Sequence, residues 1–247
     1  MVLADTTRHT MAADIDRTLD FTELPPPPDL DPAREASFVA ESKTVEVPVA
    51  NKTVKIYTEQ VSRKDGEPVL DVLFLHGMRF SSQTWLEVMT LHKVAGWGYR
   101  AVAIDLPGYG QSTNTLEPEH NADFLAALIS VLKLTRPVIV SPSMSGAFSL
   151  PFLFDDPMTS TERAVAYVPV APILTSQFVS QFQKSQIPTL ILVGTKDTVN
   201  GKESTADLKH LPNSTYAPIE GASHPCYLDN PDAWHTLLYH FLKHLSR

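Results

Sequence analysis

The sequence predicts an α/β fold with a mostly parallel central sheet covered by helices on both faces. Short, unbroken apolar segments recur along the chain, and such segments are typical of strands buried on both faces. Segments with the i, i+3, i+4 apolar spacing of helices separate them. The chain has 247 residues, 43% of them hydrophobic, which is enough to bury one large core. Strands that alternate with helices in this way favour a single α/β domain.

The first predicted element is an antiparallel hairpin. Residues 44–49 and 53–57 alternate apolar and polar side chains on either side of a turn at residues 50–52. Further strands are expected at 69–75, 100–104, 138–140, 164–170, 189–193 and 215–219. Helices are expected at 82–95, 121–134, 145–154, 203–211 and 231–245. A leading hairpin followed by a series of βα units is the plan of an α/β-hydrolase fold.

The first 42 residues differ in composition from the rest of the chain. They hold nine acidic and three basic residues of a chain with net charge −8, and residues 25–28 are four consecutive prolines. Such a segment buries little apolar surface, and its prolines favour an extended backbone. We therefore expect a flexible acidic tail over residues 1–42 and an α/β-hydrolase domain over residues 43–247.

Composition also excludes several function classes. The chain has no basic run, so no nucleic-acid partner is expected. Its longest apolar run, residues 164–174, contains two prolines and is far shorter than the roughly 20 residues that span a bilayer. The N-terminal segment resembles neither a secretory signal nor a transit peptide, and the single cysteine agrees with a reducing compartment. We expect a cytoplasmic protein that does not contact membranes, and a monomer.

Ser143 lies where a catalytic nucleophile is expected. It follows the predicted strand 138–140 and precedes a predicted helix, which is the context of a nucleophile elbow. The elbow strains the backbone of the nucleophile, and the residues two before and two after it must be small because their Cβ atoms crowd each other. Ser141 and Ser145 occupy the places where the usual G-x-S-x-G pattern has glycines. Serine is small enough, but the departure makes the motif weak on its own.

Two further residues complete a predicted catalytic triad. Asp197 follows the strand 189–193, and His224 follows the last strand. Both therefore fall at the carboxyl ends of strands, where open parallel sheets place their chemistry. Taken singly, the aspartate also fits an Asx turn and the histidine a surface loop. The chain order Ser143, Asp197, His224 is that of α/β-hydrolases, and the three residues together predict nucleophilic catalysis.

Backbone amides are expected to form the oxyanion hole. One is the amide of Met144, next to the nucleophile and at a helix N-terminus, where the helix dipole favours negative charge. The second is assigned to Met78, in the segment LHGM that follows the strand 69–75. His76 in the same segment is expected to be structural.

Three other motifs resemble functional sites but lack neighbouring residues that those sites require. The glycines at 108 and 110 lack the third glycine and the following helix of a dinucleotide site. His240 and His244 have helical spacing but no accompanying glutamate, so no metal site is expected. Cys226 has no paired base, and we expect it to be a buried apolar residue. The residues themselves assign no cofactor-binding site.

The connection between the sixth predicted strand and the next one bears on substrate size. Only residues 175–187 separate the segment VAPIL from the strand at 189–193. Many α/β-hydrolases carry a lid domain at this point, and this segment is too short for a lid of several helices. We therefore expect a minimal lid or none, and an open, shallow site suited to a short acyl group.

Five segments resemble the family of alpha/beta-hydrolase domain-containing protein 14, B type. They are LHGMRFSSQTW, GYRAVAIDLPGYGQS, VSPSMSG, VPVAPI and GASHPCYLDNPDAWH, which begin at residues 75, 98, 140, 168 and 221. The resemblance covers about residues 50–245. That family also carries serines on both sides of the nucleophile, so the departure from G-x-S-x-G agrees with it.

The resemblance implies a serine hydrolase or acyltransferase that uses Ser143, Asp197 and His224 as its triad. It implies small acyl esters or acetylated protein lysines as substrates, transfer of the acetyl group to coenzyme A, and no tightly bound cofactor. It further implies association with a transcription factor subunit and a location in the cytoplasm and nucleus. The alternative is an α/β-hydrolase-fold module that binds the transcription machinery without catalysis. Labelling of Ser143 by a fluorophosphonate probe distinguishes the two.

Overall fold

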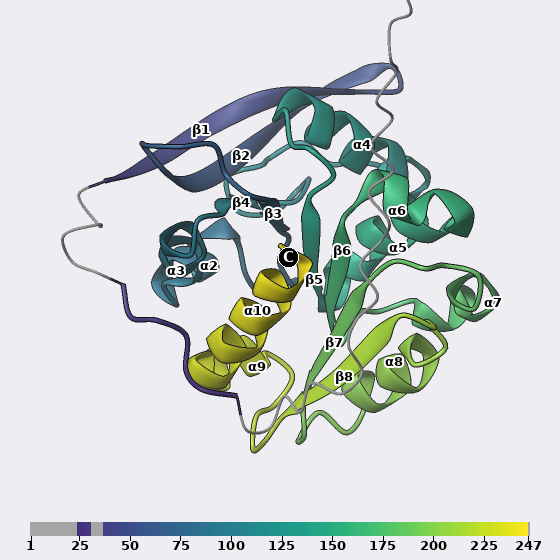
Figure 1. The fold of residues 1–247 in the computed structure, drawn as a ribbon. Coiled ribbons are helices and arrows are strands. Elements are labelled where there is room, and N and C mark those ends of the chain that lie inside the picture. The colour runs from purple at the N-terminus through teal and green to yellow at the C-terminus, as the bar shows by residue number, and fades with distance from the viewer. Residues whose placement is uncertain (1–23, 31–36, 247) are drawn as a thin grey trace, which may run out of the picture.

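The computed structural model describes residues 24–30 and 37–246, which form a single sheet between two layers of helices (Figure 1). Its strands are β1 (Phe38–Val49), β2 (Lys52–Arg63), β3 (Asp71–Phe74), β4 (Arg100–Ile104), β5 (Val138–Pro142), β6 (Ala166–Val170), β7 (Thr189–Gly194) and β8 (Ser214–Ile219). Its helices are α2 (Ser82–Glu87), α3 (Thr90–Gly96), α4 (Asn121–Val131), α5 (Gly146–Phe154), α6 (Ser160–Arg163), α7 (Val179–Phe182), α8 (Asn200–Leu208), α9 (Cys226–Asp229) and α10 (Pro231–Leu245). Short 3₁₀ helices are η1 (Pro118–His120), η2 (Ser143–Ser145), η3 (Pro157–Thr159) and η4 (Thr175–Gln177).

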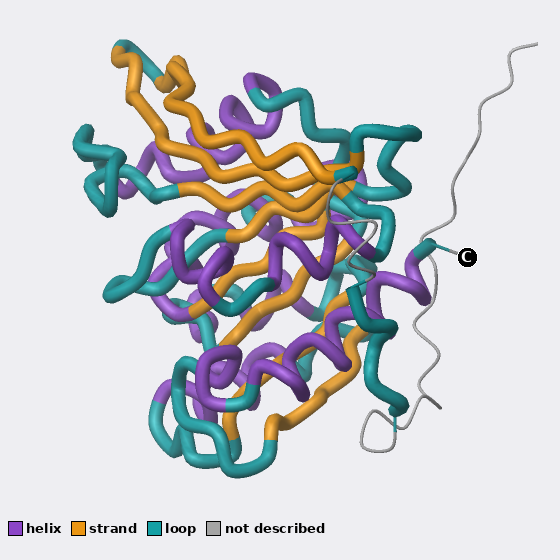
Figure 2. Tube along the Cα trace, turned by 90° about the vertical axis from the view of Figure 1, so that its left-hand side faces the viewer, coloured by secondary structure: helices purple, strands orange, loops and turns teal. Residues whose placement is uncertain are grey.

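The sheet has eight strands in the order β1-β2-β4-β3-β5-β6-β7-β8. β1 pairs antiparallel with β2, and β2 pairs antiparallel with β4. Every later pair in that order is parallel. Figure 2 shows the twist of the strands across the molecule and the long hairpin at one end of the sheet. This architecture confirms the predicted fold class, an α/β-hydrolase fold.

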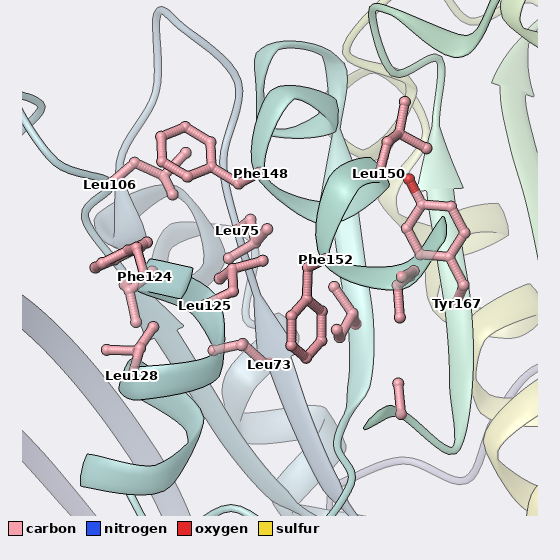
Figure 3. Close-up of a cluster of buried hydrophobic side chains, with 14 of the residues drawn as sticks. Leu73, Leu75, Leu106, Phe124, Leu125, Leu128, Phe148, Leu150, Phe152 and Tyr167 are labelled. Carbon is pink, nitrogen blue, oxygen red and sulfur yellow. The ribbon is translucent and has the colours of Figure 1, made fainter. Parts of the chain in front are cut away.

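Two hydrophobic clusters cover the two faces of the sheet. Because side chains alternate along a strand, Phe74 faces a cluster with Trp85 and Trp234 from α2 and α10. Its neighbour Leu73 faces the other cluster, which includes Phe124 from α4 (Figure 3). Successive apolar residues of one strand therefore pack into both clusters. Packed side chains therefore cover both faces of the sheet.

β1 begins earlier than the predicted domain boundary at residue 43. Residues 38–42 pair with residues 59–63 of β2, and Phe38 packs against one of the two cores. The alternation used to predict this strand starts only at residue 44, because the side chains before it are mostly exposed. The boundary at residue 43 is thus corrected: it falls inside a strand.

Part of the predicted tail lies against the folded domain. The described residues 24–30 include the four prolines, and the Pro25 carbonyl oxygen accepts a 2.9 Å hydrogen bond from Nε2 of His240 on α10. Leu30 lies against Gly96 at the end of α3. The flexibility expected for residues 1–23 and 31–36 concerns segments outside the described residues.

The helix predicted over residues 82–95 is two helices, α2 and α3. Met89 separates them because its backbone is left-handed, with φ of 59°. The bend brings Thr90 to α10, where its Oγ1 lies 3.0 Å from Nε2 of His235 and accepts a 3.1 Å hydrogen bond from Nε1 of Trp234. Apolar periodicity continues across the break, so the pattern alone does not reveal it.

The connection from β6 to β7 contains only η4 and the four-residue helix α7. All of its residues belong to the described chain, and they form no lid of several helices. The prediction of a minimal lid is confirmed. The carboxyl ends of β5, β6 and β7 are consequently not covered by a separate helical layer from this connection.

His235 makes stability depend on pH. Its side chain is 2% exposed, and burial, with a smaller contribution from Lys93, lowers its pKa from 6.5 to about 3. Between those two pH values the unfolded chain binds this proton and the folded chain does not. The stabilising contribution is therefore complete above pH 6.5 and is lost as pH falls below it.

We expect His235→Gln to make the free energy of unfolding depend less on pH in the acid range. Urea unfolding of both proteins between pH 7 and pH 4 should show a slope smaller by about 1.4 kcal/mol per pH unit in the variant, the value for one proton. The pKa of His76 is also lowered by burial, and its contribution cancels because both proteins retain it. Parallel curves for the two proteins would contradict this account.

Candidate active site

Ser143 lies at the turn between β5 and α5. Its φ is 50°, a strained left-handed conformation for a residue with a side chain. The surrounding chain holds it there, since the Ile173 amide donates a 3.0 Å hydrogen bond to the Ser143 carbonyl. Gly146 allows this close approach, because a Cβ at that position would lie 2.6 Å from the Ile173 carbonyl oxygen. The elbow geometry expected from the sequence is present.

Asp197 and His224 come to Ser143 from the loops after β7 and β8. The two loops cross tightly at Gly194, where a Cβ would lie 2.1 Å from the Ser223 carbonyl oxygen. The Lys196 amide donates a 2.8 Å hydrogen bond to the Ala222 carbonyl, which ties the loops together. Because β5, β6, β7 and β8 are neighbours in this order in the sheet, the segments that carry Ser143, Asp197 and His224 lie close together at one edge.

The three side chains form one hydrogen-bonded chain. Nδ1 of His224 lies 2.5 Å from Oδ2 of Asp197, and Nε2 of His224 lies 2.8 Å from Oγ of Ser143. The Asp197 side chain is 7% exposed and that of His224 33%, so the acid is buried while the imidazole reaches solvent. Because a carboxylate only accepts, Nδ1 carries the proton and Nε2 is free to accept the proton of the Ser143 hydroxyl.

Asp229 of α9 supports the loop that carries His224. Its carboxylate accepts hydrogen bonds from both the hydroxyl and the amide of Ser223. These bonds lower the pKa of Asp229, so the carboxylate stays ionised at neutral pH. The residue directly before His224 is therefore fixed at two atoms.

The loop after β3 holds Met78, the second expected oxyanion donor. The Gly77 carbonyl is 2.8 Å from Nδ1 of His76 and accepts a 3.0 Å hydrogen bond from the Phe80 amide. His76 is itself held by the Leu106 amide, which donates to its Nε2 at 2.9 Å. Because N–H and C=O of a trans peptide point in opposite directions, the Met78 amide points away from His76. His76 is buried, and both of its ring nitrogens contact backbone groups, which agrees with the structural role expected for it.

A cavity of about 320 Å³ opens beside Ser143. It is lined by Gly77, Met78, Arg79, Phe80, Pro142, Ser143, Val170, Asn200, His224, Pro225 and Tyr227. Sequence reasoning missed Phe80, Val170, Asn200 and Tyr227. Val170 and Phe80 could have been found, since they lie at or after the carboxyl ends of β6 and β3. Met144 is absent from the lining residues, and its side chain packs against the core.

The single cysteine, Cys226, does not line the cavity beside Ser143. Burial raises the pKa of Cys226 to about 12, so its thiol is not a nucleophile at neutral pH.

Within residues 24–30 and 37–246, no three His, Cys, Asp or Glu side chains are grouped as a metal site requires. None of the described helices combines the length and the apolar character that crossing a bilayer demands.

A serine at a strained elbow, hydrogen-bonded through a histidine to a buried acid on a mostly parallel sheet, is the arrangement of an α/β hydrolase. The model of the Alpha/beta hydrolase family matches residues 72–175. In rat (Rattus norvegicus), the "Putative protein-lysine deacylase ABHD14B" is 46% identical over 181 residues, which cover 71% of this chain and 84% of the relative. The human (Homo sapiens) protein of the same name is 45% identical over 187 residues, covering 73% and 87%.

The chain therefore belongs to the alpha/beta hydrolase family, in the group of the ABHD14 proteins. Protein ABHD14A of Rattus norvegicus is similar at 42% identity over 179 residues, covering 71% of this chain and 72% of that protein. Among solved structures, a CIB-like hydrolase from Thermoplasma acidophilum has a TM-score of 0.72 at 21% identity and covers 83% of this chain and 99% of its own. At that identity the structure bears on the fold alone.

Proposed function

We propose that the chain is a serine hydrolase and acyltransferase that removes short acyl groups through an acyl-serine intermediate. The observation that carries the proposal is the unbroken hydrogen-bonded chain from Ser143 through His224 to Asp197. It provides a nucleophile, a base and a group that sets the tautomer of the base. The relatives named as protein-lysine deacylases support an acylated lysine as the acyl donor.

In the proposed first step, His224 takes the proton of Ser143 as the serine oxygen attacks the acyl carbonyl carbon. The negative charge develops on the carbonyl oxygen, and the Met144 and Met78 amides are proposed to stabilise it. The carboxylate of Asp197 stabilises the imidazolium that results. His224 then gives its proton to the leaving alcohol or amine, and the acyl group stays on Ser143.

In the second step, His224 takes a proton from an acceptor that attacks the acyl-serine. With water, the products are the free acid and the regenerated serine. With a thiol, the acyl group moves to sulfur, and the proton returns to Ser143. Coenzyme A is proposed as this thiol, and it is a substrate in the scheme; the support for it is the family resemblance.

The size of the cavity favours a short acyl group. About 320 Å³ is at the small end of ligand pockets, and half-buried Phe80 contributes to its apolar wall. The short connection between β6 and β7 leaves the site open to a bulky carrier such as a protein chain. An acetyl group on a large substrate fits these two features better than a long lipid chain does.

Single-turnover measurements test both steps. Excess enzyme mixed with a chromogenic acetyl ester should release the alcohol rapidly and leave one acetyl group on Ser143, detected by peptide mass spectrometry. Breakdown of this intermediate should accelerate when coenzyme A is added, with acetyl-coenzyme A as the product. Alcohol release without an acetylated Ser143 would rule out the covalent mechanism. If acetyl-Ser143 breaks down at the same rate with and without coenzyme A, only the transfer to coenzyme A is ruled out.

A further inference from the structure

Four buried hydroxyl groups form a line behind the nucleophile elbow. Tyr167 of β6 lies 3.0 Å from Ser149 of α5, and Ser149 lies 2.7 Å from Ser141 of β5. Ser141 lies 2.9 Å from Ser145, whose hydroxyl is 2.7 Å from the Pro142 carbonyl oxygen. All four side chains are fully buried. Figure 3 shows the Tyr167 hydroxyl directed towards α5.

The direction of every hydrogen bond in this line follows from proton counting. A carbonyl oxygen cannot donate, so Ser145 must donate to Pro142. Each hydroxyl has one proton, and therefore Ser141 donates to Ser145, Ser149 donates to Ser141, and Tyr167 donates to Ser149. Burial raises the pKa of Tyr167 to about 12, so the phenol keeps the proton that starts the chain. Hydrogen bonds aligned head to tail polarise and strengthen one another.

The chain ends on the peptide group that leads into Ser143. The Pro142 carbonyl belongs to the same peptide plane as the Ser143 nitrogen, so holding that oxygen fixes the plane before the nucleophile. The plane after it is fixed by the hydrogen bond from the Ile173 amide to the Ser143 carbonyl. Both peptide planes beside the strained residue are thus anchored. Glycines at positions 141 and 145 would remove the hydroxyls that anchor the first plane.

We propose that Tyr167, Ser149, Ser141 and Ser145 act as positioning residues, which hold the Ser143 elbow in its reactive conformation through this directional chain of hydroxyls. The inference rests on the proposed function, because it concerns how fast Ser143 is acylated. None of the four side chains lines the cavity beside Ser143. Their loss should therefore change the rate of acylation and leave substrate binding intact.

The experiment is a double-mutant cycle between the two ends of the chain, using Ser145→Ala, Tyr167→Phe and the double variant. The rate of fluorophosphonate labelling and kcat for p-nitrophenyl acetate should fall about tenfold in Ser145→Ala, the order expected for one buried hydrogen bond. Tyr167→Phe should cause a smaller fall of about threefold, because its effect passes through three intervening bonds. KM should change little in either variant.

The double variant should match Ser145→Ala alone. Once the last hydroxyl is gone, Tyr167 no longer acts on the Pro142 carbonyl, so the two losses do not multiply. Coupling between two groups that share no direct hydrogen bond is a result that a purely structural role would not produce. Effects that multiply, or a wild-type labelling rate in Ser145→Ala, would overturn the inference.

Ser185→Ala is the matched control. Ser185 is buried and lies 2.7 Å from Ser160, which donates to the Pro157 carbonyl at 2.8 Å, so it starts a similar hydroxyl chain that does not lead to the elbow. Its labelling rate should equal that of the wild type even where its melting temperature falls. If Ser145→Ala does not fold, Ser145→Gly, which removes the same hydroxyl, replaces it in the cycle. Absence of labelling in the wild type would count against the proposed function itself.

Discussion

Replacing Ser143 with alanine should abolish labelling by fluorophosphonate and reduce acyl-ester turnover by about 10⁴-fold or more. The hydroxyl oxygen is the atom that would carry the acyl group, and no other side chain of the site can take its place. His224 lies 2.8 Å from it, so the base would remain without a nucleophile to activate. The measurement is probe labelling on a gel together with steady-state turnover of p-nitrophenyl acetate.

The variant should fold as the wild type does. Ser143 contributes only its hydroxyl to the bond with His224, and alanine retains the backbone conformation with its hydrogen bond from Ile173. Ser185→Ala, at a buried serine that does not line the cavity, serves as the control and should label fully. If neither the wild type nor Ser143→Ala labels while both are folded, the non-catalytic binding module becomes the better description. Equal labelling of both proteins would place the reactive nucleophile elsewhere.

The sequence predicts the sheet well because two features mark its strands: their apolar composition and their regular alternation with helices. The segments 72–75, 138–140 and 190–193 are apolar at every position, as strands buried on both faces are. The side chains on the two faces of each of these segments pack into separate hydrophobic clusters, so both faces are apolar. Chain order then places the serine, the acid and the histidine at one edge, so their meeting follows from topology.

What the sequence does not reveal depends on single torsions and on contacts between distant segments. The break at Met89 is one left-handed residue in an otherwise helical pattern. The cavity wall joins Phe80 from the loop after β3, Asn200 from α8 and Tyr227 from α9, and no spacing rule links them. The serines beside the elbow look like a departure from the glycine pattern. Only the burial of these serines and the hydrogen-bond distances that link them through Ser149 to Tyr167 show that they form a hydrogen-bonded chain.

Replacing Asp197 with asparagine should lower kcat for acetyl-ester hydrolysis by about 10³–10⁴-fold. The change removes one charge and almost no volume, so the fold should survive it. The carboxylate accepts the proton of His224 Nδ1 across 2.5 Å, whereas an amide NH₂ group in the same place donates. Donation to Nδ1 stabilises the tautomer that carries its proton on Nε2. That nitrogen then cannot accept the proton of Ser143.

KM should stay close to the wild-type value, because Asp197 does not line the cavity beside Ser143. The matched control is Asp207→Asn on α8, where the carboxylate accepts a 2.7 Å hydrogen bond from Thr175 outside the Ser143–His224–Asp197 chain. We expect the Asp207→Asn variant to retain most of the wild-type activity. The comparison then shows whether the loss in Asp197→Asn comes from the changed tautomer of His224 or merely from removing a negative charge. Turnover by Asp197→Asn within about threefold of the wild type would mean that the tautomer of His224 is set by another group. In that case the short contact between the two side chains would hold the loops after β7 and β8 together without taking part in the chemistry.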